Sequence, residues 1–319
     1  MHRGRSPLVR RSDAVHRRPV GTAGPRARHP PQSEAGVGAP RQDGEVLPHL
    51  AAPGYDPGFL TARVPLPTPT DARATRTLTY PRFTVLLDPA RRLAVMTGVN
   101  IDGALLRDVP RSGDWDLDPR VAADEQAGPA LYARNDLDRG HLVRRRDPGW
   151  GGAAEARAAT EATFVYPNAA PQVNVFNQSK DLWLGLEDHV LEYADATDQR
   201  VSVFTAPVLA DDDPEYRGIR VPRRFVKIAA WAGEAAAGPA LRAAGFVLDQ
   251  SSLLDRVLGM PRAADLGAYR TFQAPIDEIA ALAGLDVEPL AAADVLAPTA
   301  VRGGDAWRPL HAPEEIVLG

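Results

Sequence analysis

Short runs of β-branched and aromatic residues alternate with turn residues through the middle of the chain. Residues 83–87 and 92–97 form two such runs, and the Asp-Pro-Ala-Arg segment between them predicts a β-hairpin. The same texture predicts further strands at residues 164–166, 201–205 and 225–230. These strands are short and unevenly spaced, which is typical of a sheet whose neighbours are joined by loops of different length.

Helical spacing of apolar residues is confined to a few segments. Residues 182–194 carry an apolar stripe, and a short helix over residues 279–283 is predicted to end at Gly284. No internal repeat is visible. Strands mixed irregularly with few helices predict an α+β fold rather than a doubly wound sheet.

The ends of the chain differ from its middle in composition. Residues 1–50 are rich in Arg, Pro and Gly and lack apolar periodicity, so they are predicted to be a disordered tail. Such an arm could bind nucleic acid or an acidic partner, but a solvated tail, or a start codon placed too far upstream, is the simpler interpretation. Residues 55–295 are expected to form the domain, and residues 296–319 a C-terminal loop or tail.

Charge is distributed unevenly. The formal net charge is −4, yet residues 1–45 hold nine Arg and four acidic residues, about +5, which leaves about −9 on the rest. Bulk charge therefore does not predict nucleic-acid binding. Cations concentrated at a cleft would still suffice, because salt confines the influence of each charge to roughly 8–10 Å.

The chain contains no Cys, which excludes disulfides, thiolate metal sites and a Cys nucleophile. Any metal must be bound by nitrogen and oxygen, which favours a hard ion such as Mg²⁺ or Mn²⁺. The sequence has no run of 18 apolar residues and no apolar h-region near its N-terminus, so neither a membrane span nor Sec export is predicted. A cytoplasmic location is favoured, with non-classical secretion as the alternative.

Four residues suited to phosphodiester chemistry stand together at a predicted strand end: Asp138, Arg139, Gly140 and His141. A neutral imidazole can take a proton from water at neutral pH, and the guanidinium of Arg139 matches phosphate oxygens. Gly140 permits either a positive φ or the close approach of a substrate to the backbone. The residue types are common, so a strand-end turn with a structural His is the alternative at this point.

A second polar cluster follows within 50 residues. It contains Asn-x-x-Pro-Gln from Asn168 to Gln172, an Asn-Gln pair at Asn177, and Trp-x-x-Leu-Glu ending at Glu187. With Asp-Arg-Gly-His, and in this order, these motifs resemble the DNA/RNA non-specific endonuclease family, which includes secreted bacterial nucleases and mitochondrial endonuclease G. The similarity extends from about residue 60 to about residue 286. It implies a central antiparallel sheet flanked by helices, with a ββα-metal (His-Me finger) nuclease core.

The resemblance implies a metal-dependent hydrolysis of DNA and RNA. His141 would be the general base that activates water, and Asn177 the only protein ligand of a single Mg²⁺, with Mn²⁺ as an alternative. The ion would stabilise the leaving 3′-oxygen and the charge on phosphorus. Glu187 would hold metal-bound water.

The other residues implied by the resemblance would position or bind the substrate. Arg139 would bind phosphate, Asn168 would support the site, and Asp138 would orient the loop. Arg111 precedes a Trp-x-x-Asp-Pro segment that begins at Trp115, and would contact phosphate near the leaving group. Its spacing from that segment varies among relatives, and a solvated loop charge is the alternative for Arg111.

The sequence departs from the family pattern at two places. Asn177 and Glu187 are ten residues apart, further than in most relatives, and on one continuous helix they would be separated by about 15 Å. We therefore predict that the helix starts later, with Ser179 or Asp181 as its N-cap.

The second departure is Leu191, which stands where many relatives place a phosphate-binding Arg. Residues 144–146, three consecutive Arg, could compensate by following the nucleic-acid backbone, or could be an ordinary solvated face. Trp183 is expected in the core rather than as a platform for base stacking. His189 is expected to point away from the metal.

The alternative to an active nuclease is a catalytically inactive nuclease-like module that binds nucleic acid or protein. The wider motif spacing, the missing Arg and the acidic domain favour it, whereas the presence of both His141 and Asn177 favours the enzyme. The expected partners are DNA and RNA, contacted through the phosphate backbone, and an inhibitor or immunity protein. No membrane partner is expected, and a homodimer is compatible with the family.

Overall fold

The computed structural model describes residues 53–174, 183–235, 238–260, 270–296, 307–312 and 315–318. Within these ranges, the side chains of residues 183–189, of residues 234–235 and of Arg270 are not described. The chain divides into two compact units, residues 1–45 and 46–319. Every described residue belongs to the second unit, so the predicted disordered tail lies outside the described residues.

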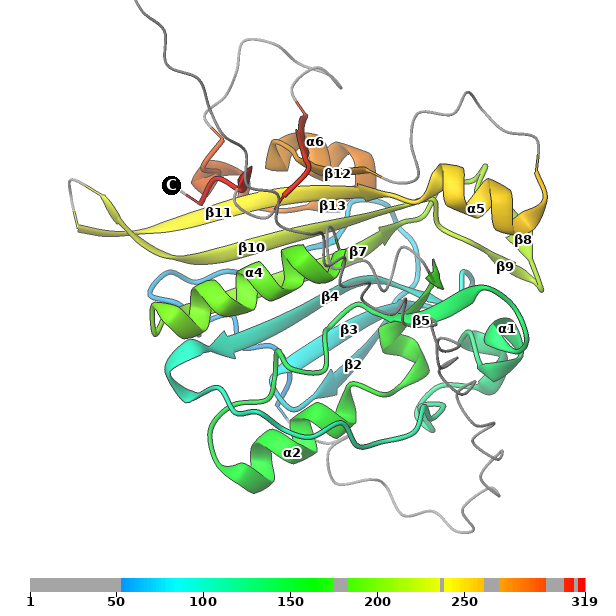
Figure 1. Ribbon diagram of the computed structural model, residues 1–319, viewed down its shortest axis with the longest axis horizontal. Coiled ribbons are helices and arrows are strands. Elements are labelled where there is room, and N and C mark those ends of the chain that lie inside the picture. Colours follow the sequence, from blue (N-terminus) through cyan, green and yellow to red (C-terminus); the bar gives the residue numbers. More distant parts are fainter. Residues whose placement is uncertain are drawn as a thin grey trace, which may run out of the picture. The chain divides into compact units, whose positions relative to one another are not determined.

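An antiparallel sheet of eight strands forms the centre of this unit (Figure 1). Each neighbouring pair in it is antiparallel, and the order is β14-β12-β11-β10-β7-β4-β3-β2. The strands are β2 (Arg76–Tyr80), β3 (Phe83–Asp88), β4 (Leu93–Asp102), β7 (Arg200–Val208), β10 (Arg224–Ala235), β11 (Gly238–Asp249), β12 (Arg270–Gln273) and β14 (Arg308–Leu310).

Both faces of the sheet are buried. Successive side chains of a strand point to opposite faces, so one strand contributes side chains to the core on each side. In β10, Phe225 and Ala229 pack into one apolar cluster, whereas Val226 and Ile228 pack into another. Complete burial of an apolar side chain of this size stabilises the fold by about 1.5–3 kcal/mol. The sheet is therefore the middle layer between two cores.

Different helices cover the two faces. One face, which we call the α4 face, packs against α4 (Trp183–Ala196) through Val190 and Leu191, and against α5 (Ser251–Leu258). The opposite α6 face packs against α6 (Ile276–Ala283) through Ile276 and Ile279. Helix α6 ends at Gly284 in the left-handed region, with φ of 64°, as the sequence predicts.

Shorter elements complete the unit. The pair β5 (Leu137–His141) and β6 (Ala169–Val173) is antiparallel and contributes apolar side chains to the core of the α4 face. The remaining elements are β1 (Thr68–Pro69), η2 (Gly103–Leu105), η3 (Ala123–Glu125), α1 (Pro129–Tyr132), α2 (Ala153–Ala162), η4 (Tyr166–Asn168), β8 (Glu215–Tyr216), β9 (Ile219–Arg220), β13 (Leu285–Asp286) and η5 (Ala291–Ala293). In chain order β5, β6 and α4 give the expected succession of two strands and a helix.

The predicted α+β class and the central antiparallel sheet are confirmed, but two local predictions are wrong. Residues 164–166 do not form a strand. Val165 makes a single bridge to Asp116 and is followed by η4, a 3₁₀ turn. Within the C-terminal segment expected to be loop or tail, β14 pairs with β12, and the Gln273 side chain bonds both the N–H and the C=O of Val317.

No helix in the described part of the chain is long and apolar enough to cross a membrane.

Candidate active site

The β5–β6 pair places the Asp-Arg-Gly-His motif at the edge of the domain core. His141 is the last residue of β5 and pairs with Ala169 of β6. Leu137 at the other end of β5 is buried, as are Leu142 and Val143 directly after it. These apolar residues anchor the strand on both sides of the motif. His141 is therefore carried by a packed strand rather than by a flexible loop.

Aromatic rings surround His141. The imidazole lies 4.6 Å from the Trp115 ring and 4.9 Å, edge to face, from the Phe164 ring, measured between ring centroids. Tyr166 extends the cluster, with its ring 5.9 Å from that of Trp115. The Nε2 atom of His141 is buried and has no hydrogen-bond partner among the described residues. The imidazole is therefore oriented by ring packing, and the described residues do not supply a hydrogen-bond partner for Nε2.

Burial, and after it the positive charges of Arg111, Arg145, Arg144 and Arg139, together lower the pKa of His141 from its ordinary value near 6.5 to about 3. Desolvation disfavours the charged imidazolium, and nearby cations disfavour it again. At neutral pH the imidazole is thus uncharged. This is the protonation state that a general base needs before it accepts a proton.

Arg111 and Arg139 lie on the same ring cluster as His141. The guanidinium carbon of Arg139 is 5.8 Å from the centre of the Trp115 ring, and that of Arg111 is 5.9 Å from the centre of the Phe164 ring. Both side chains are in exposed positions. The structure therefore brings together Arg111, Arg139 and His141, although 30 residues separate the first from the last in sequence.

The segment that carries Arg111 and Trp115 is fixed by buried polar contacts. The buried carboxylate of Asp118 accepts a hydrogen bond from the Tyr80 hydroxyl at 2.5 Å and forms an ion pair with Arg120 at 2.7 Å. Further upstream, the Ser112 hydroxyl donates to Glu161 of α2 at 2.9 Å. The Asp of the Trp-x-x-Asp-Pro segment thus holds the loop, while the Trp contacts His141.

Asn168 is completely buried and holds the backbone beside His141. Its amide nitrogen donates to the carbonyls of Val143 and Thr163 at 2.9 and 3.0 Å, and its side-chain oxygen accepts from the Val143 N–H at 2.9 Å. The N–H of Leu142 donates to the Asn168 carbonyl. Asn168 thus fixes the backbone of Val143, two residues after His141.

Gly140 is required by the close approach of a side chain rather than of a substrate. A Cβ built at Gly140 would lie 2.2 Å from Cδ of Gln172, and the φ of Gly140 is not positive. Gln172 is completely buried, and neither its amide nitrogen nor its amide oxygen has a hydrogen-bond partner among the described residues. Asp138 pairs with Gln172 in the β5–β6 register and is partly buried.

Of the three consecutive Arg at residues 144–146, Arg144 and Arg145 carry charges that lower the pKa of His141. The Nη1 atom of Arg145 donates to the Val109 carbonyl at 3.0 Å. Leu191, at the position where the resemblance implies a phosphate-binding Arg, is 2% exposed and packs in the core of the α4 face. The position is thus part of the core rather than of the charged surface.

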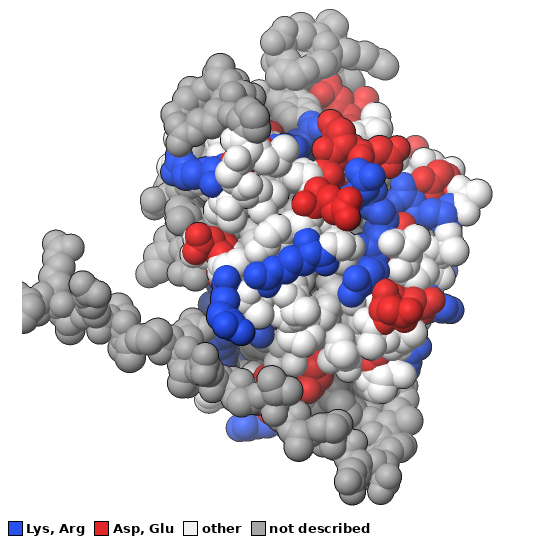
Figure 2. Space-filling model, turned by 90° about the vertical axis from the view of Figure 1, so that its right-hand side faces the viewer, with Lys and Arg blue, Asp and Glu red and all other residues white. Residues whose placement is uncertain are grey.

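Figure 2 shows the face of the molecule on the side of α1, α5 and the β8–β9 pair. Lys and Arg side chains gather in a band across it, with Asp and Glu groups beside them. The net charge of the whole chain is −4. Around His141, four Arg charges act on the imidazole, those of Arg111, Arg139, Arg144 and Arg145. Positive charge concentrated in this way can attract nucleic acid despite a negative net charge.

The predicted metal-binding half of the site lies largely outside the described residues. Asn177 is among the residues that are not described. Trp183, Glu187 and His189 lie in α4, but their side chains are not described. Helix α4 begins at Trp183, and the proposed N-cap residues precede the described part. Within the described ranges, no group of three or more His, Asp or Glu side chains could hold a metal ion.

Sequence reasoning missed the ring cluster as part of the site. The sequence pattern indicates Trp115 only as part of the segment that follows Arg111, and Phe164 and Tyr166 only as strand residues. The signal was present, because a Trp four residues after the candidate Arg and two aromatic residues just before Asn168 are unusual in a chain with 6% aromatic residues. The bridge between Asp116 and Val165 holds the two segments of this cluster together, and no local pattern predicts it.

Comparison with known proteins identifies a family, a relative and similar solved structures. The family described as DNA/RNA non-specific endonuclease matches residues 63–294. Uncharacterized protein y4fB of Sinorhizobium fredii (strain NBRC 101917 / NGR234) is 34% identical over 289 residues, which are 82% of this chain and 42% of that protein. The chain thus spans less than half the length of this relative.

A solved structure, described as the EndoG/EndoGI complex, is 21% identical and covers 68% of this chain and 86% of its own, with a TM-score of 0.48. The family match covers well over half of the 319 residues and contains every motif assembled around His141. The chain therefore belongs to the DNA/RNA non-specific endonuclease family.

Proposed function

We propose that the chain hydrolyses phosphodiester bonds of both DNA and RNA, with His141 as the general base and one Mg²⁺, or alternatively Mn²⁺, as cofactor. The observation that carries this proposal is the His141 imidazole. Its Nε2 atom is buried without a partner among the described residues, and it lies on a ring cluster shared with Arg111 and Arg139. A base and two phosphate-binding cations thus converge on one place.

His141 takes the proton of the attacking water. It is neutral before the substrate binds, because desolvation and the surrounding cations oppose protonation. A phosphodiester bound to those cations brings negative charge, which offsets their effect and makes the imidazole a stronger base. A positioned base of this kind typically contributes about 10²–10⁴ in rate.

Arg139 and Arg111 bind the phosphate on either side of the reacting bond. Their guanidinium groups donate planar pairs of hydrogen bonds to phosphate oxygens. Contacts of this type fix the position of the backbone but carry no base sequence. A site that contacts only phosphate need not sense the 2′-hydroxyl either, and this accounts for a substrate range that includes DNA and RNA.

The donor set expected for the metal suits Mg²⁺. A carboxamide oxygen from Asn177, together with water and phosphate oxygen, is the type of ligand set that this small hard ion accepts, because it retains several waters. When bound, the ion supplies Lewis-acid stabilisation of the leaving 3′-oxygen. Glu187 would accept hydrogen bonds from the surrounding water and hold it in place.

Asp138 and Asn168 act as positioning residues. The buried amide of Asn168 bonds both backbone groups of Val143, which fixes the chain directly after His141. Asp138 lies on β5 opposite Gln172 and would orient the motif from the other side. Neither residue needs to contact the substrate to affect the rate.

An inhibitor or immunity protein is a proposed partner. A nuclease that cuts DNA and RNA regardless of sequence would damage the cell that makes it, so a protein that blocks the site is expected. The cations around His141 would favour an acidic surface on such a partner.

The test is to incubate the purified chain with supercoiled plasmid and with total RNA, in Mg²⁺ and in EDTA. We expect both substrates to be cut only with the metal, and the new ends to carry 5′-phosphates. If no divalent ion supports cleavage but the chain still retards nucleic acid on a gel, the protein is an inactive binding module and the proposed hydrolysis is wrong.

A further inference from the structure

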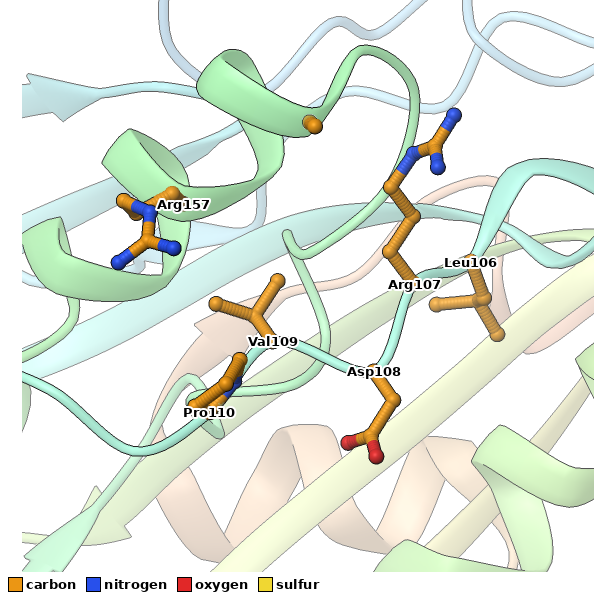
Figure 3. Close-up of a pocket in the computed structure, with 7 residues that line it drawn as sticks. Leu106, Arg107, Asp108, Val109, Pro110 and Arg157 are labelled. Atoms are coloured by element: carbon orange, nitrogen blue, oxygen red, sulfur yellow. The ribbon is translucent and has the colours of Figure 1, made fainter.

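A pocket of about 410 Å³ opens between the loop after η2 and the first turns of α2 (Figure 3). Its lining residues are Leu106, Arg107, Asp108, Val109, Pro110, Ala153 and Arg157. The volume lies within the roughly 300–1,000 Å³ typical of small-ligand sites. None of the residues so far assigned to the proposed reaction lines it, so the pocket is a separate feature.

The pocket combines an apolar wall with two cations. Figure 3 shows Val109 and Pro110 on one side and Arg157 of α2 across from them. Arg107 is held at the wall, because its Nε donates to the Gly151 carbonyl and its backbone N–H donates to the Gly149 carbonyl at 2.9 Å. A nucleotide would fit both features of the pocket: its sugar or base would pack against the apolar wall, and its phosphate would bind a guanidinium.

Arg157 is the cation free to bind a ligand. It is exposed on α2 and makes no hydrogen bond or ion pair with any residue that the structure describes. The carboxylate of Asp108, the one acidic group in the lining, points away from Arg157 in Figure 3. The Arg157 side of the pocket is therefore positive.

The pocket adjoins the cations around His141. The carbonyl of Val109, in the pocket wall, accepts a hydrogen bond from Arg145, whose charge acts on His141. On α2, Glu161 lies four residues, or about 6 Å, beyond Arg157, and binds Ser112 next to Arg111. One strand of a duplex advances about 3.4 Å per nucleotide along its axis, so this offset corresponds to about two nucleotides.

We propose that this pocket binds a nucleotide of the substrate strand that flanks the scissile phosphate, with Arg157 on the phosphate of that nucleotide. The inference rests on the proposed function, because it takes the Arg111 side of the ring cluster as the path of the strand. It adds a phosphate contact beyond those of Arg111 and Arg139.

The test compares Arg157→Ala with Arg63→Ala, both in a His141→Ala background so that binding is measured without cleavage. Arg63 is a matched control, since it is exposed and has no partner among the described residues. It precedes Val64, which packs on the α6 face. Ala is the best helix former, so Arg157→Ala should leave α2 intact, as circular dichroism would verify.

Fluorescence anisotropy with a labelled 12-nucleotide single strand gives the readout. We expect Arg157→Ala to weaken binding about tenfold, as loss of a charged contact does, and to reduce the slope of log K against log salt concentration by about 0.7. Arg63→Ala should change neither quantity. A dinucleotide, which reaches only the scissile position, should bind equally to both variants.

Two results would overturn the inference. Equal binding of the 12-mer by Arg157→Ala and Arg63→Ala would show that the pocket is not on the strand's path. A free 5′-mononucleotide that loses as much affinity as the 12-mer would show a mononucleotide site instead. Failure of the wild-type chain to cut nucleic acid, with the Arg157 effect intact, would remove the proposed hydrolysis and leave the strand-binding pocket standing.

Discussion

Buried polar groups on the two faces of the central sheet differ in whether their hydrogen bonds are made. On the α6 face, Asn100 accepts from the Asp56 N–H at 2.7 Å and donates to Ser202 at 3.1 Å, so its amide is fully engaged. On the α4 face, Nε2 of His141 and the amide of Gln172 are buried without hydrogen-bond partners among the described residues. A buried polar atom without a partner costs about 1–3 kcal/mol. The α4 face therefore retains, beside satisfied groups such as Asn168, two buried side chains without described partners where the proposed chemistry occurs.

The largest expected effect on stability belongs to the α6 face. Ile279→Ala removes a completely buried side chain that packs against Gly245, and should lower the free energy of unfolding by about 2–5 kcal/mol. Urea denaturation measures this loss. The kcat/KM for plasmid cleavage, measured well below the melting temperature, should stay within twofold of wild type, and a larger fall would mean that the two faces are not independent.

Asn168 and Asn100 form a matched pair across the sheet, since each is buried and makes three side-chain hydrogen bonds to its surroundings. Replacing either by Ala leaves backbone groups without partners and should cost about 2–3 kcal/mol of stability. Only Asn168→Ala should also lower kcat, by about tenfold or more, because Asn168 fixes the backbone of Val143, two residues after His141. Equal kcat values for the two variants would contradict a positioning role for Asn168.

Gly140→Ala tests how tightly β5 and β6 are packed at the motif. The new Cβ would lie 2.2 Å from Gln172, so we expect a loss of about 1–3 kcal/mol from overpacking and a displaced His141. The double variant Gly140→Ala/Gln172→Ala makes room for the methyl group and should recover part of both stability and activity. If the double variant is no better than the single one, the requirement for Gly140 has another cause.

The smallest expected effect is a change in pH dependence. Burial, and next the charge of Arg111, depress the pKa of His141 to about 3. Arg111→Gln removes one positive charge, so the pKa rises and the acidic limb of the kcat/KM profile moves to higher pH. Arg63→Gln, on the α6 face, should leave the limb in place. A limb that does not move in Arg111→Gln would separate Arg111 from the base.

The lowered pKa of His141 also makes the free energy of unfolding depend on pH. The unfolded chain binds the imidazole proton near pH 6.5, whereas the folded chain binds it only near pH 3. The unfolded state thus holds more protons between these values, and the free energy of unfolding falls as the pH is lowered through that window. In His141→Ala this part of the acid sensitivity should disappear, as denaturation at pH 7 and pH 4.5 would reveal.

The sequence predicts those parts of the fold that depend on local pattern. The β3–β4 hairpin, β7, β10 and the end of α6 at Gly284 all follow from strand texture or a glycine stop. Residues 164–166 have strand texture too, but the rings of Phe164 and Tyr166 are buried against Trp115 in a turn. An apolar run indicates burial, and only the tertiary structure decides which conformation buries it.

Long-range pairing accounts for the other differences. Strand β14 contains Pro309, which reads as a loop residue, yet it pairs with Phe272 at the edge of the sheet, where a missing N–H is tolerated. In the site, the motif identified His141 and its neighbours, and the structure brings Arg111 to them. The Gln172 amide, which has no partner among the described residues, and the Arg157 pocket both arise from contacts between distant segments, which no spacing of residues reveals.

The most direct test of the central claim is the single-turnover rate of plasmid cleavage by His141→Ala in Mg²⁺, beside wild type and His311→Ala. His311 is an exposed His outside the ring cluster, so it controls for the substitution itself. Loss of the general base predicts a rate at least ~10²-fold below wild type for His141→Ala, with an unchanged affinity for DNA and an unchanged rate for His311→Ala. A His141→Ala rate within a few-fold of wild type would contradict the account.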